Sequence, residues 1–126
     1  MPYMTRWIHE PYILDTTFTG ILSIDEIDEV MNDYLARLNE PLSLYILVNF
    51  ARAVTVPTNL LQINSIIEVI NHDNLQWLVT VNPVGFDSNT TRLLAQDKVK
   101  VFNNKENALG FLRGMVRLDT GVTLES

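Results

Sequence analysis

The sequence predicts a single α/β domain built on a mixed sheet of four to five strands, with helices packed mainly on one face. Short β-type segments alternate with amphipathic helical segments after an N-terminal hairpin, which is typical of parallel strands joined by helices. Residues 44–50 are apolar at nearly every position, as in a strand that is covered on both faces. The chain has 126 residues, of which 47% are hydrophobic and 19% are charged, so it has the length and composition of one globular domain.

A β-hairpin is expected at the N-terminus. Strands are predicted over residues 5–9 and 12–18, and Pro11 separates them. Gly20 then permits a turn that a residue with a Cβ atom would resist.

A helix is expected after this hairpin. Ser23 and Glu26 have the spacing of a capping box, and Pro41 ends the helical pattern. The acidic residues of the first turns oppose the positive end of the helix dipole, so we expect them to be solvated. The apolar side chains recur every three or four positions and form one stripe: Ile24, Ile27, Met31, Tyr34, Leu35 and Leu38.

A second helix is predicted from Pro57, which suits a first helical turn, to about Asn71. Leu61 and Val69 fall outside its apolar stripe and are expected to face water, which indicates weakly a surface for a partner. The stripe itself consists of Leu60, Ile63, Ile66, Ile67 and Ile70.

The C-terminal part predicts strands over residues 76–82 and 99–102, with a short helix between them that ends at Gln96. A final helix is expected to start near Asn103, with a stripe made of Ala108, Leu109, Leu112 and Met115. Residues 114–126 are expected to be a fraying tail.

The composition argues against several classes of function. Fifteen acidic and nine basic residues give a net charge of −6, which disfavours nucleic acid or an anionic membrane as the main partner. There is no cysteine, and neither His9 nor His72 has a metal-ligand spacing, so no metal and no cofactor is expected. No glycine-rich phosphate loop and no nucleophile elbow is present, so the protein is expected not to be an enzyme. With no secretion signal and no apolar run that could cross a bilayer, a cytoplasmic protein is expected.

Candidate binding residues gather where parallel strands end, since ligands collect at that edge of open α/β sheets. We expect this rim to include Asn49, Phe50, Arg52, Thr55, Thr58 and Asn59. Helix capping alone also explains Thr55 and Thr58, and this alternative stays open.

Several segments carry a family resemblance. The run Phe18-Thr19-Gly20-Ile21-Leu22-Ser23 leads directly into the acidic helix, and a buried strand Tyr45-Ile46-Leu47-Val48-Asn49 follows. Residues 72–79 and 101–112 continue the same layout. Together these segments resemble the STAS superfamily, in particular its SpoIIAA-like branch of small bacterial proteins. The resemblance spans about residues 5–113, which defines the expected core, and leaves residues 114–126 as the tail.

The resemblance implies that the protein acts through protein partners, as the anti-sigma-factor antagonists do. It places Thr58 at the position of the serine that those proteins phosphorylate. Asn49 and Pro57 stand where the antagonists carry aspartates, so this sequence departs from the family at both acidic positions.

Two hypotheses follow. The first is a non-catalytic regulatory or protein-interaction domain that docks through the rim and through Leu61 and Val69, with self-association as one form of docking. The second is a protein that binds a small molecule, either apolar or anionic, such as a lipid or a nucleotide. The residues expected to hold that ligand are Phe50, Arg52, Phe86 and Arg92.

Overall fold

The computed structural model describes residues 3–40, 43–55, 63–81 and 98–124. The predicted helix that ends at Gln96 lies outside these ranges, as does the start of the predicted second helix. Along the chain the elements are β1 (Tyr3–His9), β2 (Ile13–Ile21), α1 (Ile24–Leu38), β3 (Leu44–Thr55), α2 (Asn64–Ile70), β4 (Leu75–Val81), β5 (Val99–Phe102) and α4 (Lys105–Thr120).

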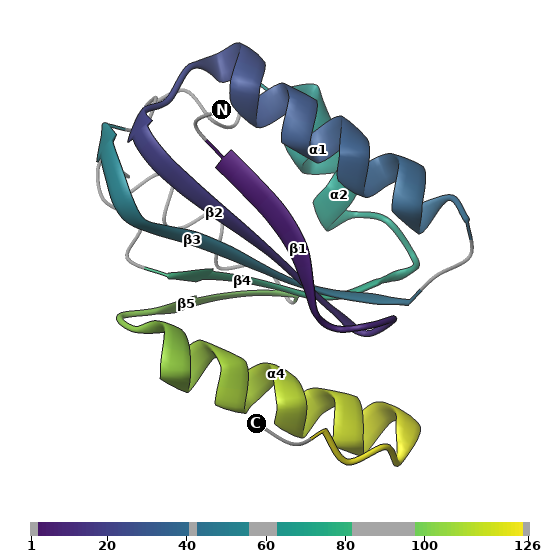
Figure 1. The fold of residues 1–126 in the computed structure, drawn as a ribbon. Helices are drawn as coiled ribbons and strands as arrows, with labels where there is room; N and C mark the ends of the chain where they lie inside the picture. Colours follow the sequence, from purple (N-terminus) through teal and green to yellow (C-terminus); the bar gives the residue numbers. More distant parts are fainter. Residues whose placement is uncertain (1–2, 41–42, 56–62, 82–97, 125–126) are drawn as a thin grey trace.

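The strands form one mixed sheet of five strands in the order β1-β2-β3-β4-β5 (Figure 1). β1 is antiparallel to β2, and every later pair is parallel. The prediction of an α/β fold on a mixed sheet is therefore confirmed. Gly20 lies inside β2 and not in a turn; its φ of +74° coincides with a shift in the pairing with β3. Glycine adopts this conformation at low cost because it has no Cβ atom.

Helices cover both faces of the sheet. α1 and α2 lie on one face and α4 lies on the other (Figure 1). Right-handed crossovers that add strands in one direction place their helices on the same face, as α1 and α2 show. α4 follows the last strand and makes no crossover, so it is free to cover the opposite face. The expectation of helices mainly on one face misses this second layer.

β3 lies at the centre of both apolar layers. Residues 44–50 are all buried, as their continuous apolar sequence predicts. Alternate side chains of the strand enter the α1/α2 core and the α4 core in turn.

The N-terminus of α1 confirms Ser23 as its N-cap, with Glu26 as the residue that the Ser23 side chain contacts. The Ser23 hydroxyl accepts a hydrogen bond from the Glu26 amide at 3.2 Å and donates one to the Glu26 carboxylate at 2.8 Å. Most of the predicted stripe is buried, but Ile24 is exposed.

The predicted orientation of the second helix is wrong. Val69 is fully buried and Ile67 is 43% exposed, the reverse of the expectation. The apolar residues around α2 are so dense that periodicity alone fits two orientations. Packing decides between them, because α2 contacts both α1 and β4 and turns Val69 inward.

α4 corrects two further expectations. Its cap is Asn104 and not Asn103, because the Asn104 side chain accepts a hydrogen bond from the Asn107 amide at 2.8 Å. The helix continues to Thr120 with Val116 fully buried, so residues 114–120 do not fray. Within the described ranges, none of the helices combines the length and the apolar character needed to cross a membrane.

Candidate functional site: a cavity at the start of the edge strand

An open cavity of about 1130 Å³ lies where β1 begins, between the sheet, α1 and the first turn of α4. β2 extends beyond the first residue of β1, and among the described residues it pairs there with β3. The lining side chains come from both faces: Arg6, Thr17, Thr19, Asn49, Arg52, Lys105 and Met4 from the α4 side, and Tyr3, Thr5, Glu29, Val30 and Asp33 from the α1 side.

The α4 side of the cavity is basic. Arg6, Arg52 and Lys105 all line it and come from β1, β3 and α4. Arg52 is exposed, and it lies opposite Thr19 in the β2–β3 pairing. Asn49 is nearly buried beside them, and its side-chain oxygen accepts a hydrogen bond from the Ala51 amide at 2.9 Å. The side-chain amide of Asn49 also carries two N–H donors.

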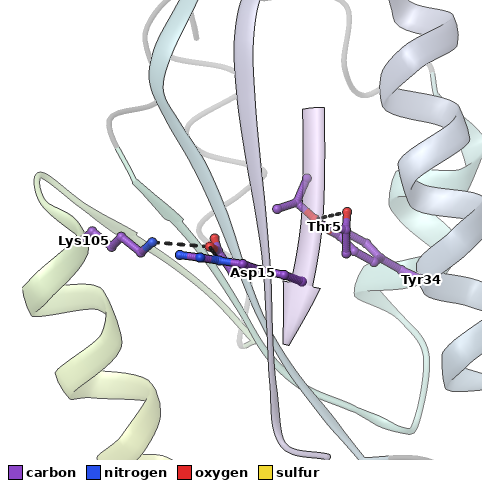
Figure 2. Close-up of polar contacts among 6 residues, drawn as sticks. Thr5, Asp15, Tyr34 and Lys105 are labelled. Atoms are coloured by element: carbon purple, nitrogen blue, oxygen red, sulfur yellow. Dashed lines mark hydrogen bonds and ion pairs between the residues drawn. The ribbon is translucent and has the colours of Figure 1, made fainter. Parts of the chain in front are cut away.

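Asp15 of β2 lies behind two of these cations and is 1% exposed. Its Oδ2 lies 3.3 Å from Lys105 Nζ and 3.6 Å from Arg6 Nε. Its Oδ1 is buried and has no hydrogen-bond partner among the described residues. Figure 2 shows Asp15 and Lys105 facing one another across the α4 side of the sheet.

This arrangement leaves positive charge in excess. One enclosed carboxylate faces two cations, and Arg52 adds a third positive charge to the same wall of the cavity. A buried carboxylate with incomplete hydrogen bonding lowers stability, so its presence is better explained by what it holds in place. Asp15 holds Arg6 and Lys105 at the cavity wall.

The α1 side of the cavity is acidic. Glu29 and Asp33 line it beside the hydroxyl of Tyr3. A hydrogen bond with Glu29, together with nearby carboxylates, raises the pKa of the Tyr3 hydroxyl. Asp33 also pairs with Arg37 at 3.2 Å, so Glu29 is the less compensated of the two carboxylates.

A chain of hydroxyl groups fixes α1 against the hairpin beneath this side. The hydroxyl of Tyr34 donates to Thr16 Oγ1, which lies 2.9 Å from Thr5 Oγ1 (Figure 2). Complete burial raises the pKa of the Tyr34 hydroxyl, which therefore stays neutral. These residues build the wall of the cavity, and only Thr5 lines it.

Of the residues expected from the sequence, Asn49 and Arg52 line the cavity. Phe50 does not belong to a rim, because it is buried and stacks on Phe18 with ring centroids 5.3 Å apart. Val69 does not belong to a surface either, since it lies in the α1/α2 core. The Thr55 backbone ends β3, but its side chain lies outside the described part of the chain, as do Thr58, Asn59, Leu61, Phe86 and Arg92.

Sequence reasoning missed Asp15, Arg6 and Lys105. Asp15 carried a usable signal, because it is the one charged residue of the segment 12–21 and charged residues are rarely buried in strands. Lys105 carried another signal, because the positive end of the helix dipole makes a first helical turn unfavourable for a cation. Arg6 alternates with apolar residues in an edge strand and carries no such signal.

The histidines lie outside this cavity. His9 accepts a hydrogen bond from Arg113 at 3.1 Å, and His72 interacts with Asn39 and the Asn74 amide. Within the ranges that the structure describes, no cluster of three histidine or acidic side chains could hold a metal ion.

Comparison with known proteins gives no assignment: no family model matches this chain, and no curated protein is significantly similar to it.

Proposed function

We propose that this domain is a non-catalytic module that binds a small anionic molecule, carrying a carboxylate or a phosphate, in the cavity at the start of β1. The observation that carries the proposal is the convergence of Arg6, Arg52 and Lys105 on one wall, from three separate elements. Such convergence is notable in a chain with a net charge of −6.

The chemistry of the wall suits an anion. Guanidinium groups present a planar set of donors that matches carboxylate and phosphate oxygens. The amide donors of Asn49 and the hydroxyl of Thr17 can add neutral hydrogen bonds on the same side. A bound anion would compensate the excess positive charge that Asp15 leaves.

Binding without turnover fits the same residues. No histidine is among the described lining residues, and Asp15 is enclosed behind Arg6 and Lys105. A general base must lie within hydrogen-bond reach of the proton that it removes. The basic wall therefore offers donors and charge, and the lining carboxylates Glu29 and Asp33 lie on the opposite, α1 side of the cavity.

Thermal unfolding tests this proposal, because a ligand that binds only the folded state raises the melting temperature. We expect glutarate and inorganic phosphate to raise it above the value in sodium chloride of matched ionic strength. Arg52→Gln is expected to raise the dissociation constant at least about tenfold, because a hydrogen bond to a charged group contributes about 1.5–3 kcal/mol.

Arg117→Gln is the matched control, since it removes the same charge from an exposed position of α4 outside the cavity. Equal stabilisation of all three proteins, or stabilisation by none of the anions, would contradict the proposal.

A regulatory docking role of the STAS type is the second candidate, with Thr58 as its phosphoacceptor. One observation favours a protein-contacting surface: Ile21 and Val54 are 73% and 67% exposed on neighbouring strands. Sedimentation of the wild type, Ile21→Asp and the control Leu118→Asp tests the self-associating form. A dimer that only Ile21→Asp dissociates supports this role, whereas a monomer at every concentration removes self-association.

A further inference from the structure

We propose that the ligand of this cavity is zwitterionic, with its anionic group on the α4 side of the sheet and an ammonium group on the α1 side. This inference rests on the proposed anion binding and adds a second charged contact. It follows from the segregation of charge within one cavity: Arg6, Arg52 and Lys105 lie on one face, and Glu29 and Asp33 lie on the other.

The alternation of side chains along β1 contributes to this segregation. Tyr3 packs against the α1/α2 core, so Met4 and Arg6, at the alternate positions, lie on the opposite, α4 face. The cavity is lined from both faces of the sheet at this point, so a flexible molecule inside it can contact both.

The anionic half of the site is built around a buried group. Asp15 is 99% enclosed by the protein, and its Oδ1 finds no partner in the described part of the chain. Its Oδ2 lies beside two of the cations, so this one side chain organises that half of the cavity.

The cationic half presents carboxylates that protein cations compensate only in part. Asp33 pairs with Arg37, but Glu29 has only the neutral Tyr3 hydroxyl as its described contact inside the cavity. An ammonium group bound here would lie between two carboxylates and a hydroxyl acceptor.

Apolar side chains line both sides of the cavity. Met4 lies on the α4 side, and Val30 and the ring of Tyr3 lie on the α1 side, where they suit a methylene chain. Each side-chain layer is centred about 5 Å from the plane of a sheet, so charges on opposite faces are at least about 10 Å apart. An extended chain of eight carbons with a charge at each end spans about that distance.

Three probes of related structure test the inference by amide chemical-shift titration: ω-aminooctanoate, octanedioate of the same length, and the short zwitterion γ-aminobutyrate. We expect ω-aminooctanoate to bind at least tenfold more tightly than either of the others. The double variant Glu29→Gln/Asp33→Asn should reduce its preference over octanedioate to less than threefold. Asp25→Asn/Asp28→Asn removes the same charge from the same helix outside the lining residues and should leave the preference unchanged.

The outcomes separate the two proposals. Equal or tighter binding of octanedioate by the wild type would overturn the zwitterionic ligand and leave anion binding intact, provided that Arg52→Gln weakens both probes. Failure of Arg52→Gln to weaken either probe would overturn anion binding itself. If both double variants lower the preference equally, the effect is one of net charge and the assignment of Glu29 and Asp33 is wrong.

Discussion

Asp15 combines nearly complete burial with incomplete hydrogen bonding. Its two cationic partners differ from it, because the side chains of Arg6 and Lys105 are 60% and 33% exposed. The desolvation cost of the ion pairs therefore falls mainly on the carboxylate. Removing the carboxylate and removing one of the cations should therefore change the free energy of unfolding by different amounts.

We expect Asp15→Asn to change the free energy of unfolding by less than about 1 kcal/mol, because the two cations can return to water. Lys105→Gln should lower it by about 1–3 kcal/mol, since the enclosed carboxylate then has only Arg6 beside it. Urea unfolding followed by circular dichroism measures both. A loss of several kcal/mol in Asp15→Asn would show that this residue is needed for the fold itself.

Val69 and Ile67 allow a direct test of how α2 is oriented. Val69→Glu places a charge in the α1/α2 core and should lower the free energy of unfolding by about 3–5 kcal/mol. Ile67→Glu changes an exposed position and should stay within about 0.5 kcal/mol of the wild type. Denaturant titrations that reverse this order would refute the orientation of the helix.

The sequence shows why individual positions were assigned with unequal success. Asn49 and Arg52 could be placed at the cavity because the end of a buried strand is readable from its apolar run. Phe50 lies one residue from Asn49 and points to the opposite face, so nearness in sequence misled. Val69 required knowledge of the partners of α2, which periodicity does not contain.

α4 is attached to the sheet at three points along its length. Lys105 contacts Asp15 at its start, Arg113 contacts His9 in its middle, and the hydroxyl of Tyr45 donates to Asp119 near its end at 2.7 Å. Ala108, Leu112 and Val116 are buried between these points at four-residue spacing. The helix therefore belongs to the folded core over its whole length.

The C-terminal turns of α4 provide a test of this attachment. Val116→Ala removes two buried carbon atoms and should lower the free energy of unfolding by at least about 1.5 kcal/mol. Leu118→Ala, at a position 77% exposed, should change it by less than about 0.5 kcal/mol. Equal small effects in thermal unfolding would mean that these turns do fray.

The contact between β1 and α4 should make stability depend on pH. Burial, and secondarily the charge of Arg113, lowers the pKa of His9, which stays neutral while it accepts the hydrogen bond. Below the unfolded value of about 6.5 and above the lowered folded value, the unfolded chain binds more protons than the folded one. The free energy of unfolding should therefore fall as pH decreases through this window.

His9→Gln keeps an acceptor for Arg113 but cannot be protonated, so its stability should change less over the same window. Urea midpoints of the two proteins at several pH values measure the difference. Identical pH profiles would show that His9 does not contribute to the pH dependence.

Most elements could be predicted because their signals are local. The capping box at Ser23 and the unbroken apolar run of β3 identify α1 and the central strand without any knowledge of the partners. The end of α4 could not be predicted, because exposed Leu118 and buried Val116 follow one another closely and the glycines nearby weaken the helical pattern.

The cavity is a property of the assembled molecule. Its cations Arg6, Arg52 and Lys105 come from β1, β3 and α4 and are far apart in the sequence. Lys105 reaches Asp15 only because α4 folds onto the opposite face of the sheet. The sequence-based expectation placed helices mainly on one face, so it could not anticipate this meeting. The predicted rim contains Asn49 and Arg52 of this site, but neither Arg6 nor Lys105.

The resemblance to STAS proteins and the cavity lead to different expectations about where a partner would act. The resemblance directs attention to Thr58 and the segment that follows β3. The described structure directs attention to the start of β1, where charge, a buried carboxylate and open volume coincide.

Mapping the amide resonances that shift when glutarate binds is the most direct test of where the ligand lies. We expect the changes to centre on Arg6, Thr17, Arg52 and Lys105, and to disappear in Arg52→Gln but persist in Arg117→Gln. Shifts centred on α2 or on His72, or shifts that Arg52→Gln leaves intact, would contradict the assignment of this cavity as the binding site.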